Sequence, residues 1–512
     1  MTPARAWSVA LVGMEGTMVE VEAAIGGGLP RTILVGLADT SLNEARDRCK
    51  AAVASTGVGW PSQLLTINLS PATLPKTGAH YDLSIVAAVA AADGRLPKGA
   101  LEGLVLLGEL GLDGRVRAVR GVLPALLAAA SNGFSRAIVP ATQVGEAQLV
   151  QGITVWWVRD LADVMEVLAG RPVLLPAIES ATPVEPSEVK DLIDVVGQVE
   201  AKWALEVAAA GRHHLFFHGP PGVGKTLLAE RLPGLLPDLD LPEALEVSAI
   251  HSLAGCGLDD GLVIRPPYSD PHHSASLASL VGGGARVAMP GSVSKAHRGV
   301  LFLDEAPEFS PRVLEALRVP LESGQIVLGR SAAQATYPAR FQLILAANPC
   351  PCGMAATKGA QCQCAPMAIR RYAQRVSGPV LDRIDIHQHL RPLRRSYLEA
   401  ALAAGEPTAV VADRVRAARD RQRRRLSALG WRTNGEIPGP ALRRKLRLPV
   451  GFELLDDAVA QGRLSARGVD KVLRLSWTIA DLAGADHPSR SHLRTALAMR
   501  RGESLEASHG RS

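Results

Sequence analysis

The 512-residue sequence predicts an α/β protein in three parts: an N-terminal α+β domain, a parallel-sheet core around a glycine-rich loop, and a C-terminal helical lid. Three observations support this class. A glycine-rich octapeptide stands between an apolar strand and a helix, later apolar strands end in polar side chains, and the chain after Leu390 is helical and arginine-rich. A chain of this length is expected to hold several cores, because single cores stop growing at about 250–300 residues.

The composition is that of a globular protein, with 47% hydrophobic and 21% charged residues. Apolar runs are too short to cross a bilayer, and the first residues do not resemble a secretion signal, so we expect no membrane partner and a cytoplasmic location. The six cysteines do not indicate a disulfide framework in that compartment. The net charge of +6 permits nucleic acid as a partner without requiring it.

Residues 1–170 alternate β-rich and alanine-rich segments, which predicts a mixed α+β domain. The expected strands and helices follow in chain order: strands at 19–23, 32–35, 64–69 and 104–109, and helices at 41–55, 82–92 and 122–130. Residues 171–189 are proline-rich without periodicity and predict a linker.

The octapeptide from Gly219 to Thr226 matches the phosphate-loop pattern G-x-x-x-x-G-K-[ST] at every fixed position. Its backbone N–H groups and the following helix N-terminus favour a bound phosphate. Lys225 is expected to reach the β- and γ-phosphates, and Thr226 to bind Mg²⁺. The predicted ATP-binding residues are Gly219, Pro220, Pro221, Gly222, Val223, Gly224, Lys225, Thr226 and, before the preceding helix, Gln198.

Two later strands carry the other candidate catalytic residues. The apolar run 300–303 ends in Asp304 and Glu305, which we expect to hold Mg²⁺ and to polarise the attacking water. The run 343–347 ends in Asn348, which can orient the same water. Arg383 follows, and its planar guanidinium suits the charge that develops on a γ-phosphate.

Four cysteines form two close pairs, Cys350 with Cys352 and Cys362 with Cys364. Four thiolates can hold zinc tetrahedrally, and the intervening loop has too little apolar material for a core of its own. Free thiols or a redox pair are the alternatives.

The lid carries two basic patches. One is the helix 412–426, whose apolar stripe leaves its arginines on other faces, and the second is Arg443, Arg444, Lys445 and Arg447. A solvated helix and a phosphate-contacting surface both fit this pattern.

The order of these elements is similar to that of AAA+ ATPases. Segments 271–276, 281–284, 297–305, 317–324 and 348–353 resemble the magnesium-chelatase clade. Nearly the whole chain resembles the ComM/YifB family, which implies a hexameric ATP-driven motor acting on DNA during natural transformation. The resemblance also implies pore insertions at 253–290 and 324–341, Arg383 as an arginine finger acting across a subunit interface, and a sensing arginine on a lid helix, Arg467 or else Arg474.

The segments 108–116, 126–130 and 137–140 make the first domain resemble the proteolytic domain of Lon, whose fold is like domain 2 of ribosomal protein S5. Lon works by a Ser–Lys dyad. Those positions correspond here to His80 and Leu123, so we expect a non-proteolytic relative. His80 and Asp82 can be functional, although capping or surface roles are simpler.

The expected division is therefore a Lon-like domain at 1–170, a linker at 171–189, an AAA+ core at 190–390, a lid at 391–503 and a tail at 504–512. The expected activity is Mg²⁺-dependent ATP hydrolysis that drives translocation on single-stranded or branched DNA. Zinc is a candidate second metal, bound by the four cysteines. A magnesium-chelatase-like motor that remodels a protein partner is the alternative.

Overall fold

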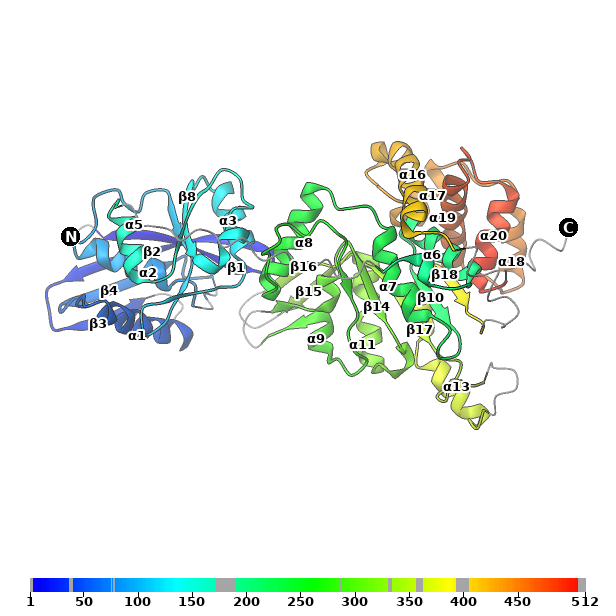
Figure 1. The fold of residues 1–512 in the computed structure, drawn as a ribbon, viewed down its shortest axis with the longest axis horizontal. Helices are drawn as coiled ribbons and strands as arrows, with labels where there is room; N and C mark the ends of the chain where they lie inside the picture. Colours follow the sequence, from blue (N-terminus) through cyan, green and yellow to red (C-terminus); the bar gives the residue numbers. More distant parts are fainter. Residues whose placement is uncertain are drawn as a thin grey trace.

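The computed structural model describes residues 3–35, 40–74, 76, 79–171, 190–284, 288–329, 334–355, 362–392 and 405–504. The linker predicted at 171–189 lies outside these residues except at its first position, and so does the predicted tail after residue 504. Figure 1 shows the chain as an elongated molecule, with the first 170 residues at one end, a central parallel sheet and the C-terminal helices at the other end. No helix in the described part of the chain is both long enough and apolar enough to cross a membrane.

The first domain is a seven-stranded mixed sheet with helices on both faces. The sheet order is β3 (Arg31–Val35), β4 (Leu64–Ser70), β2 (Glu15–Gly26), β1 (Ala4–Val12), β5 (Leu104–Leu106), β8 (Arg136–Pro140) and β9 (Thr154–Val158). The helices are α1 (Thr40–Ser55), α2 (Asp82–Ala92), α3 (Val122–Ser131), α4 (Val144–Ala147) and α5 (Leu161–Leu168). Helices α1, α2 and α5 share one apolar core, and α3 and α4 share the other.

The strand predicted at 104–109 is wrong in its extent. Strand β5 ends at Leu106, and β6 (Glu109–Leu110) pairs instead with β7 (Val116–Arg117). Gly108 separates the two, and a Cβ there would lie 2.7 Å from Leu83 Cδ1. Close packing against α2 therefore interrupts the strand.

The surface role considered for Asp82 is also wrong. Its side chain is fully buried, forms an ion pair with Arg48 at 3.1 Å and accepts a hydrogen bond from Leu110 N. Desolvation raises the pKa of Asp82 to about 6. At the two positions that correspond to the Lon dyad, Leu123 is fully buried and His80 Nε2 lies 2.9 Å from Val9 O.

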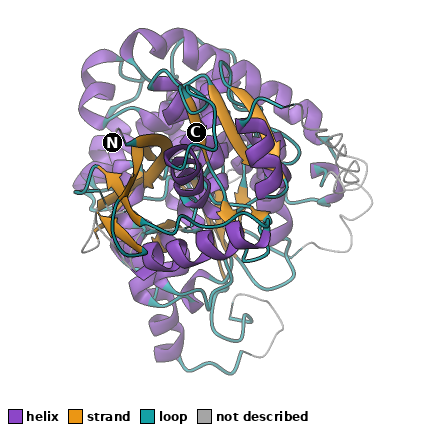
Figure 2. Ribbon diagram, turned by 90° about the vertical axis from the view of Figure 1, so that its left-hand side faces the viewer, coloured by secondary structure: helices purple, strands orange, loops and turns teal. Residues whose placement is uncertain are grey.

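The second region is a five-stranded sheet in which every strand runs parallel. Its order is β11 (Tyr268–Ser269), β14 (Val300–Leu303), β17 (Gln342–Ala347), β10 (Leu215–His218) and β18 (Ile386–His389). Burial explains the apolar runs, because all residues of β14 and β17 are buried. The flanking helices include α6 (Val199–Gly211), α7 (Lys225–Leu235), α8 (Leu241–Ala254), α11 (Pro311–Ala316), α12 (Arg318–Ser323) and α13 (Pro366–Gln374). Figure 2, seen from the side of the first domain, shows the strands of the whole molecule with helices around them.

Two hairpins lie within the predicted insertions. The pair β12 (Gly282–Gly283) and β13 (Met289–Pro290) falls in 253–290, although Tyr268–Ser269 of that span belongs to the main sheet. The pair β15 (Gln325–Gly329) and β16 (Gln334–Pro338) confirms the hairpin at 324–341. Tyr337 Oη donates a hydrogen bond to Ala288 O at 2.5 Å, so the two insertions contact each other.

The first domain packs directly on this insertion region. Gly121 N donates to Ser252 O at 3.3 Å, and buried Glu146 accepts hydrogen bonds from Leu123 N and from Ser252 Oγ on α8. Leu11 and Met14 pack against Leu253, Ala335 and Tyr337.

The C-terminal region is helical, as predicted, with α16 (Thr408–Leu426), α17 (Gly439–Lys445), α18 (Glu453–Ala460), α19 (Ala466–Leu482) and α20 (Arg490–Arg501). The predicted stripe of α16 is buried at Val411, Val415, Ala418 and Leu426. These residues share one core with α6, α19 and the central sheet, so the lid and the nucleotide-site sheet are packed together.

Candidate nucleotide site

The phosphate loop and the polar residues that end the predicted strands come together at one edge of the central sheet. Strands β10, β17 and β14 are adjacent and parallel, so their carboxyl ends meet. The glycine-rich loop follows β10, Asp304 and Glu305 follow β14, and Asn348 follows β17. Ligand sites of open α/β sheets lie at this edge.

The loop between β10 and α7 is shaped by its glycines. Gly222 and Gly224 have φ of 75° and 93°, in the left-handed region that favours glycine. A Cβ at Gly219 would lie 2.7 Å from Leu390 O, so this position also needs a residue without a side chain. The loop can therefore expose its backbone N–H groups to a phosphate at the start of α7.

Lys225 is mostly buried and points across the sheet edge. Its Nζ donates hydrogen bonds to Gly219 O at 2.7 Å, Pro220 O at 2.9 Å and Asn348 Oδ1 at 2.9 Å. Desolvation lowers the pKa of Lys225, and the charges of Asp304 and Glu305 oppose this effect. The ammonium group thus sits between the phosphate loop and Asn348, where incoming phosphates would replace carbonyl partners.

The two predicted Mg²⁺ ligands are in contact. Thr226 Oγ1 donates to Asp304 Oδ2 at 2.7 Å, and Glu305 N donates to Asp304 Oδ1 at 2.8 Å. A hydroxyl and a carboxylate are hard oxygen ligands of the kind Mg²⁺ prefers beside phosphates. Glu305 has φ of 49°, in the left-handed region that is strained for a residue other than glycine, and its side chain is exposed.

Gln198 joins the loop to the segment that follows edge strand β18. Its Nε2 donates to Val223 O at 3.1 Å and to Arg391 O at 2.9 Å. A pocket of about 260 Å³ lies here between Gln198, the loop and Pro392. Its place beside the phosphate loop is compatible with the predicted role of Gln198 in ATP binding.

Replacing Lys225 with Ala is expected to weaken ATP binding by at least about a hundredfold, because charge-assisted hydrogen bonds contribute about 1.5–3 kcal/mol each. Titration with a fluorescent ATP analogue measures this loss. The control is Lys190→Ala, which removes an exposed lysine paired with Glu230 and should leave the affinity unchanged. If Lys225→Ala bound the ATP analogue with wild-type affinity, Lys225 would not belong to the nucleotide site.

Arg383 and Arg467 lie together, held by contacts that do not include the phosphate loop. Arg383 is buried and donates hydrogen bonds to Pro379 O and to Glu322. Exposed Arg467 on α19 lies 3.8 Å from Glu322 and 3.9 Å from Asp382. The alternative, Arg474, donates instead to Ile437 O at 2.8 Å within the lid. The structure thus places Arg467, rather than Arg474, beside the candidate finger.

Two residues near these groups were not predicted from the sequence. His273, just after edge strand β11, has Nδ1 3.6 Å from Glu305 Oε2. Glu322, at the end of α12, is shared by Arg383 and Arg467. The signal for His273 was its place in the segment 271–276, which resembles the magnesium-chelatase clade, whereas the partnership of Glu322 requires the tertiary structure.

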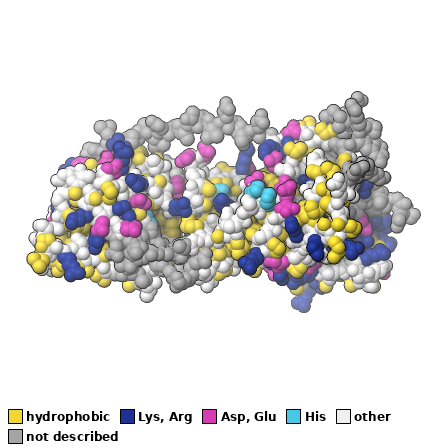
Figure 3. Space-filling model, turned by 90° about the horizontal axis from the view of Figure 1, so that it is seen from below, with side chains coloured by type: hydrophobic (Ala, Val, Ile, Leu, Met, Phe, Trp, Pro, Cys, Tyr) yellow, Lys and Arg dark blue, Asp and Glu magenta, His cyan; other side chains and the backbone are white. Residues whose placement is uncertain are grey.

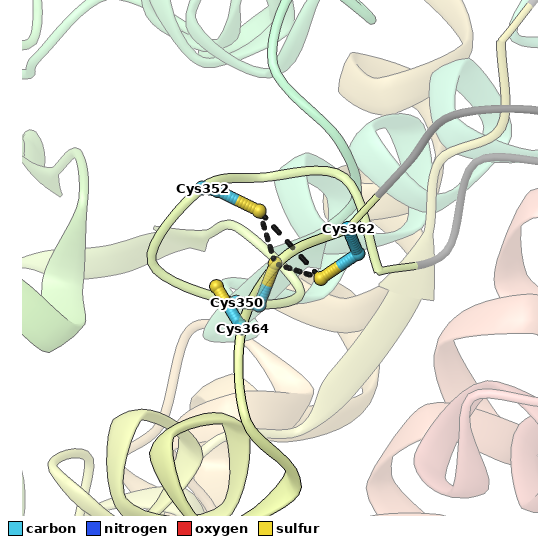
Figure 4. A group of neighbouring side chains, drawn as sticks. All are labelled: Cys350, Cys352, Cys362 and Cys364. Atoms are coloured by element: carbon cyan, nitrogen blue, oxygen red, sulfur yellow. Dashed lines mark hydrogen bonds between the residues drawn. The ribbon is translucent and has the colours of Figure 1, made fainter.

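The four cysteines converge, as Figure 4 shows. The Sγ atoms of Cys350, Cys352, Cys362 and Cys364 all lie within 4.8 Å of one another. Ala355 N donates to Cys350 Sγ at 3.3 Å, and the backbone N–H of Met354 lowers the pKa of the Cys352 thiol to about 6. Cys352 can therefore supply a thiolate near neutral pH, whereas desolvation and hydrogen bonds with Cys352 raise the pKa of the Cys362 and Cys364 thiols.

The basic patches of the lid are less open than the sequence indicates. Arg425 forms a two-point ion pair with buried Asp481 and stacks 4.4 Å above Trp477, so the prediction that it faces away from the core is wrong. Arg414 pairs with Glu206 and Glu406. By contrast, Arg424, Arg444 and Arg447 are exposed, and among the described residues none has a carboxylate partner. Figure 3 shows basic and acidic side chains interspersed on the face it presents.

A phosphate loop, a strand ending in Asp-Glu and a strand ending in Asn on one parallel sheet define a P-loop ATPase of the AAA+ class. Comparison with known families agrees. The family described as magnesium chelatase, subunit ChlI, matches residues 191–398, a ChlI subunit family matches 21–143, and the ChlI C-terminal family matches 405–500.

Full-length relatives identify the family. An uncharacterised protein of Mycobacterium tuberculosis is 52% identical over 502 residues, covering 98% of this chain and 99% of the relative. YifB of Escherichia coli is 41% identical over 495 residues, 96% of each chain, and competence protein ComM of Haemophilus influenzae is 39% identical over 506 residues, 98% of each. The chain belongs to the ComM/YifB family of magnesium-chelatase-like AAA+ ATPases.

Proposed function

We propose that this protein is a cytoplasmic, hexameric, ATP-driven motor that moves along or remodels single-stranded or branched DNA. Its work would be branch migration in recombination during natural transformation. The observation that carries the DNA part of this proposal is the similarity to competence protein ComM along 98% of both chains.

The residues at the sheet edge support the ATPase chemistry. Bound Mg²⁺ would neutralise phosphate charge, with Thr226 and Asp304 as its protein ligands. Loop N–H groups and Lys225 would bind the phosphates, and Asn348, which already touches Lys225, would orient the attacking water. Glu305 is the exposed carboxylate that can accept a proton from the attacking water.

A ring explains why the candidate finger is held apart from the loop. In the single chain Arg383 pairs with Glu322, and Arg467 lies near Glu322 and Asp382. Among the described residues, neither arginine forms a hydrogen bond or ion pair with Lys225, Thr226 or Glu305. A second copy of the chain, presenting this face, would bring arginine to the open side of the nucleotide.

We also propose that the two insertion hairpins face the central pore, and that the four cysteines hold zinc. The alternative function, a motor that remodels a protein partner, is favoured by the magnesium-chelatase descriptions of the matching families. ATPase assays with and without single-stranded, duplex and branched DNA separate the two. Stimulation by DNA supports the DNA motor, and indifference to every form favours the protein-remodelling motor.

DNA affinity is expected to fall steeply with salt, with a log–log slope of roughly −0.7 to −0.9 per contacted phosphate. Changing Arg424, Arg444 and Arg447 together to Gln should flatten this slope without changing ATP affinity, because these three exposed guanidinium groups have no carboxylate partner in the described chain. Fluorescence anisotropy of labelled DNA at several salt concentrations measures the slope.

The matched control changes three exposed arginines of the first domain, Arg5, Arg115 and Arg159, each of which is paired with a carboxylate. It removes the same net charge and should leave the slope as in the wild type. An equal flattening by both triple variants would show that net charge, rather than the lid surface, governs binding.

A further inference from the structure

The cysteine clip, defined as Cys350, Cys352, Cys362 and Cys364, begins two residues after Asn348. Strand β17 therefore leads from the sheet through Asn348 directly into the clip. Cys350 is buried, while the other three thiols are at least partly accessible to solvent. The clip is thus attached to the nucleotide site by the chain itself.

The spacing of the sulfurs fits a tetrahedral zinc ion. The Sγ–Sγ distances are 3.4 Å for Cys350 and Cys352, 3.8 Å for Cys350 and Cys362, and 3.6 Å for Cys352 and Cys362. Four sulfurs about 2.3 Å from zinc stand about 3.8 Å apart, whereas a disulfide bond joins sulfurs at about 2.05 Å. The arrangement therefore corresponds to a ligand set rather than to paired disulfides.

The segment that carries the clip also touches the phosphate loop. Gly353, in the turn between the two cysteine pairs, packs so closely on Pro221 that a Cβ at Gly353 would lie 2.6 Å from Pro221 Cδ. The next residue, Met354, lines the 260 Å³ pocket together with Gln198 and loop residues 220–223. One side of the phosphate loop is thus supported by residues that directly follow the first cysteine pair of the clip.

On its other side the loop is tied to the same strand. Lys225 Nζ joins Gly219 O and Pro220 O to Asn348 Oδ1. The segment 348–354 therefore contacts the loop twice, through the Asn348 amide and through the Gly353–Pro221 packing. A shift of this segment would displace both contacts together.

We infer that Zn²⁺ held by the cysteine clip fixes the phosphate loop and Asn348 in the arrangement that binds ATP, so that loss of the metal lowers nucleotide affinity. This inference rests on the proposed ATP site, but not on the proposed action on DNA. The clip supplies no group to the reaction. It positions the groups that do.

The first test separates the contact from the metal. Gly353→Ala leaves all four thiols in place but puts a methyl group against Pro221. We expect about one zinc per chain to remain and the affinity for a fluorescent ATP analogue to fall about tenfold, the effect of losing one charge-assisted hydrogen bond. The control is Gly133→Ala, which has φ of 83° against 80° for Gly353 but open space around it, so it carries the same backbone strain without the contact.

The second test removes the metal. Cys364→Ser should lose zinc and bind the nucleotide analogue about tenfold more weakly, again without DNA in the assay. Cys256→Ser, an exposed cysteine outside the clip, is the control and should change neither. Circular dichroism of each variant establishes that the fold is retained.

Three results would overturn the inference. Wild-type protein purified without chelator and holding no zinc would disprove the site. Zinc-free Cys364→Ser or zinc-loaded Gly353→Ala with wild-type affinity would disprove the coupling. These measurements contain no DNA, so they do not test the proposed motor function. The ATP site itself is tested by Lys225→Ala.

Discussion

Replacing Glu305 with Gln is expected to lower ATP turnover by about 10²–10⁴-fold while ATP still binds. The amide cannot accept a proton from the attacking water, whereas the phosphate contacts of Lys225 and the loop are untouched. Glu305 is suited to this role because it is exposed at the strand end and its backbone N–H bonds to Asp304, the expected metal ligand.

Single-turnover hydrolysis and analogue binding measure the two effects separately. Glu308→Gln is a matched control, because Glu308 lies one turn further along, is exposed, and pairs with Arg375 rather than with the site. Its turnover should stay within about twofold of the wild type, as for most surface substitutions. Normal hydrolysis by Glu305→Gln would exclude this residue as the base.

The sequence was sufficient for those parts of the site whose geometry is local. The phosphate loop is one contiguous motif, and its glycines indicate the backbone turn. Asp304 and Asn348 could be predicted as neighbours, because each follows an apolar run and parallel strands end at one edge. The structure then brings Asn348 within 2.9 Å of Lys225, although 123 positions separate them.

Contacts that depend on tertiary packing could not be predicted in the same way. In the sequence, Glu322 is an ordinary acidic residue near the end of a helix. In the structure it forms an ion pair with Arg383 and lies close to Arg467, which belongs to lid helix α19. The sequence places Arg425 in a run of arginines on a solvated helix. In the structure it forms an ion pair with Asp481, which lies 56 residues later in the chain. In both cases the partner comes from a distant element, so residue type and spacing carry no signal.

The fold shows the same limit. Helix α2 was predicted with its observed bounds, because its alanine-rich run starts at Asp82 and ends before Gly94. Strand β1 (Ala4–Val12) was not predicted at all. It is central in the sheet and packs into both apolar layers, through Ala6 and Ala10 on one and Val9 on the other. Such a strand lacks the polar alternation that marks an exposed face.

The other large effect concerns Arg383. Its replacement by Ala is expected to retain ATP binding and to lower hydrolysis by about 10³–10⁵-fold, the contribution typical of an arginine finger. The reason is that the guanidinium would stabilise charge on the γ-phosphate of the neighbouring subunit. Arg383→Lys should restore little, because an ammonium group lacks the planar fork. Arg375→Ala, which removes a nearby exposed arginine, is the control and should hydrolyse normally.

Mixing subunits distinguishes a finger from a residue that merely supports its own chain. Arg383→Ala and Glu305→Gln subunits are each inactive alone, but a mixed ring contains interfaces where an intact Glu305 meets an intact Arg383. Such rings should regain part of the activity, whereas a residue acting within its own subunit would give none, since every chain in the mixture is defective.

Glu322→Gln adds a further test. It frees Arg383 from its ion pair without removing the guanidinium, so hydrolysis should persist with altered dependence on protein concentration. Full activity of Arg383→Ala by itself would mean that this arginine is a structural partner of Glu322 and that another residue completes the site.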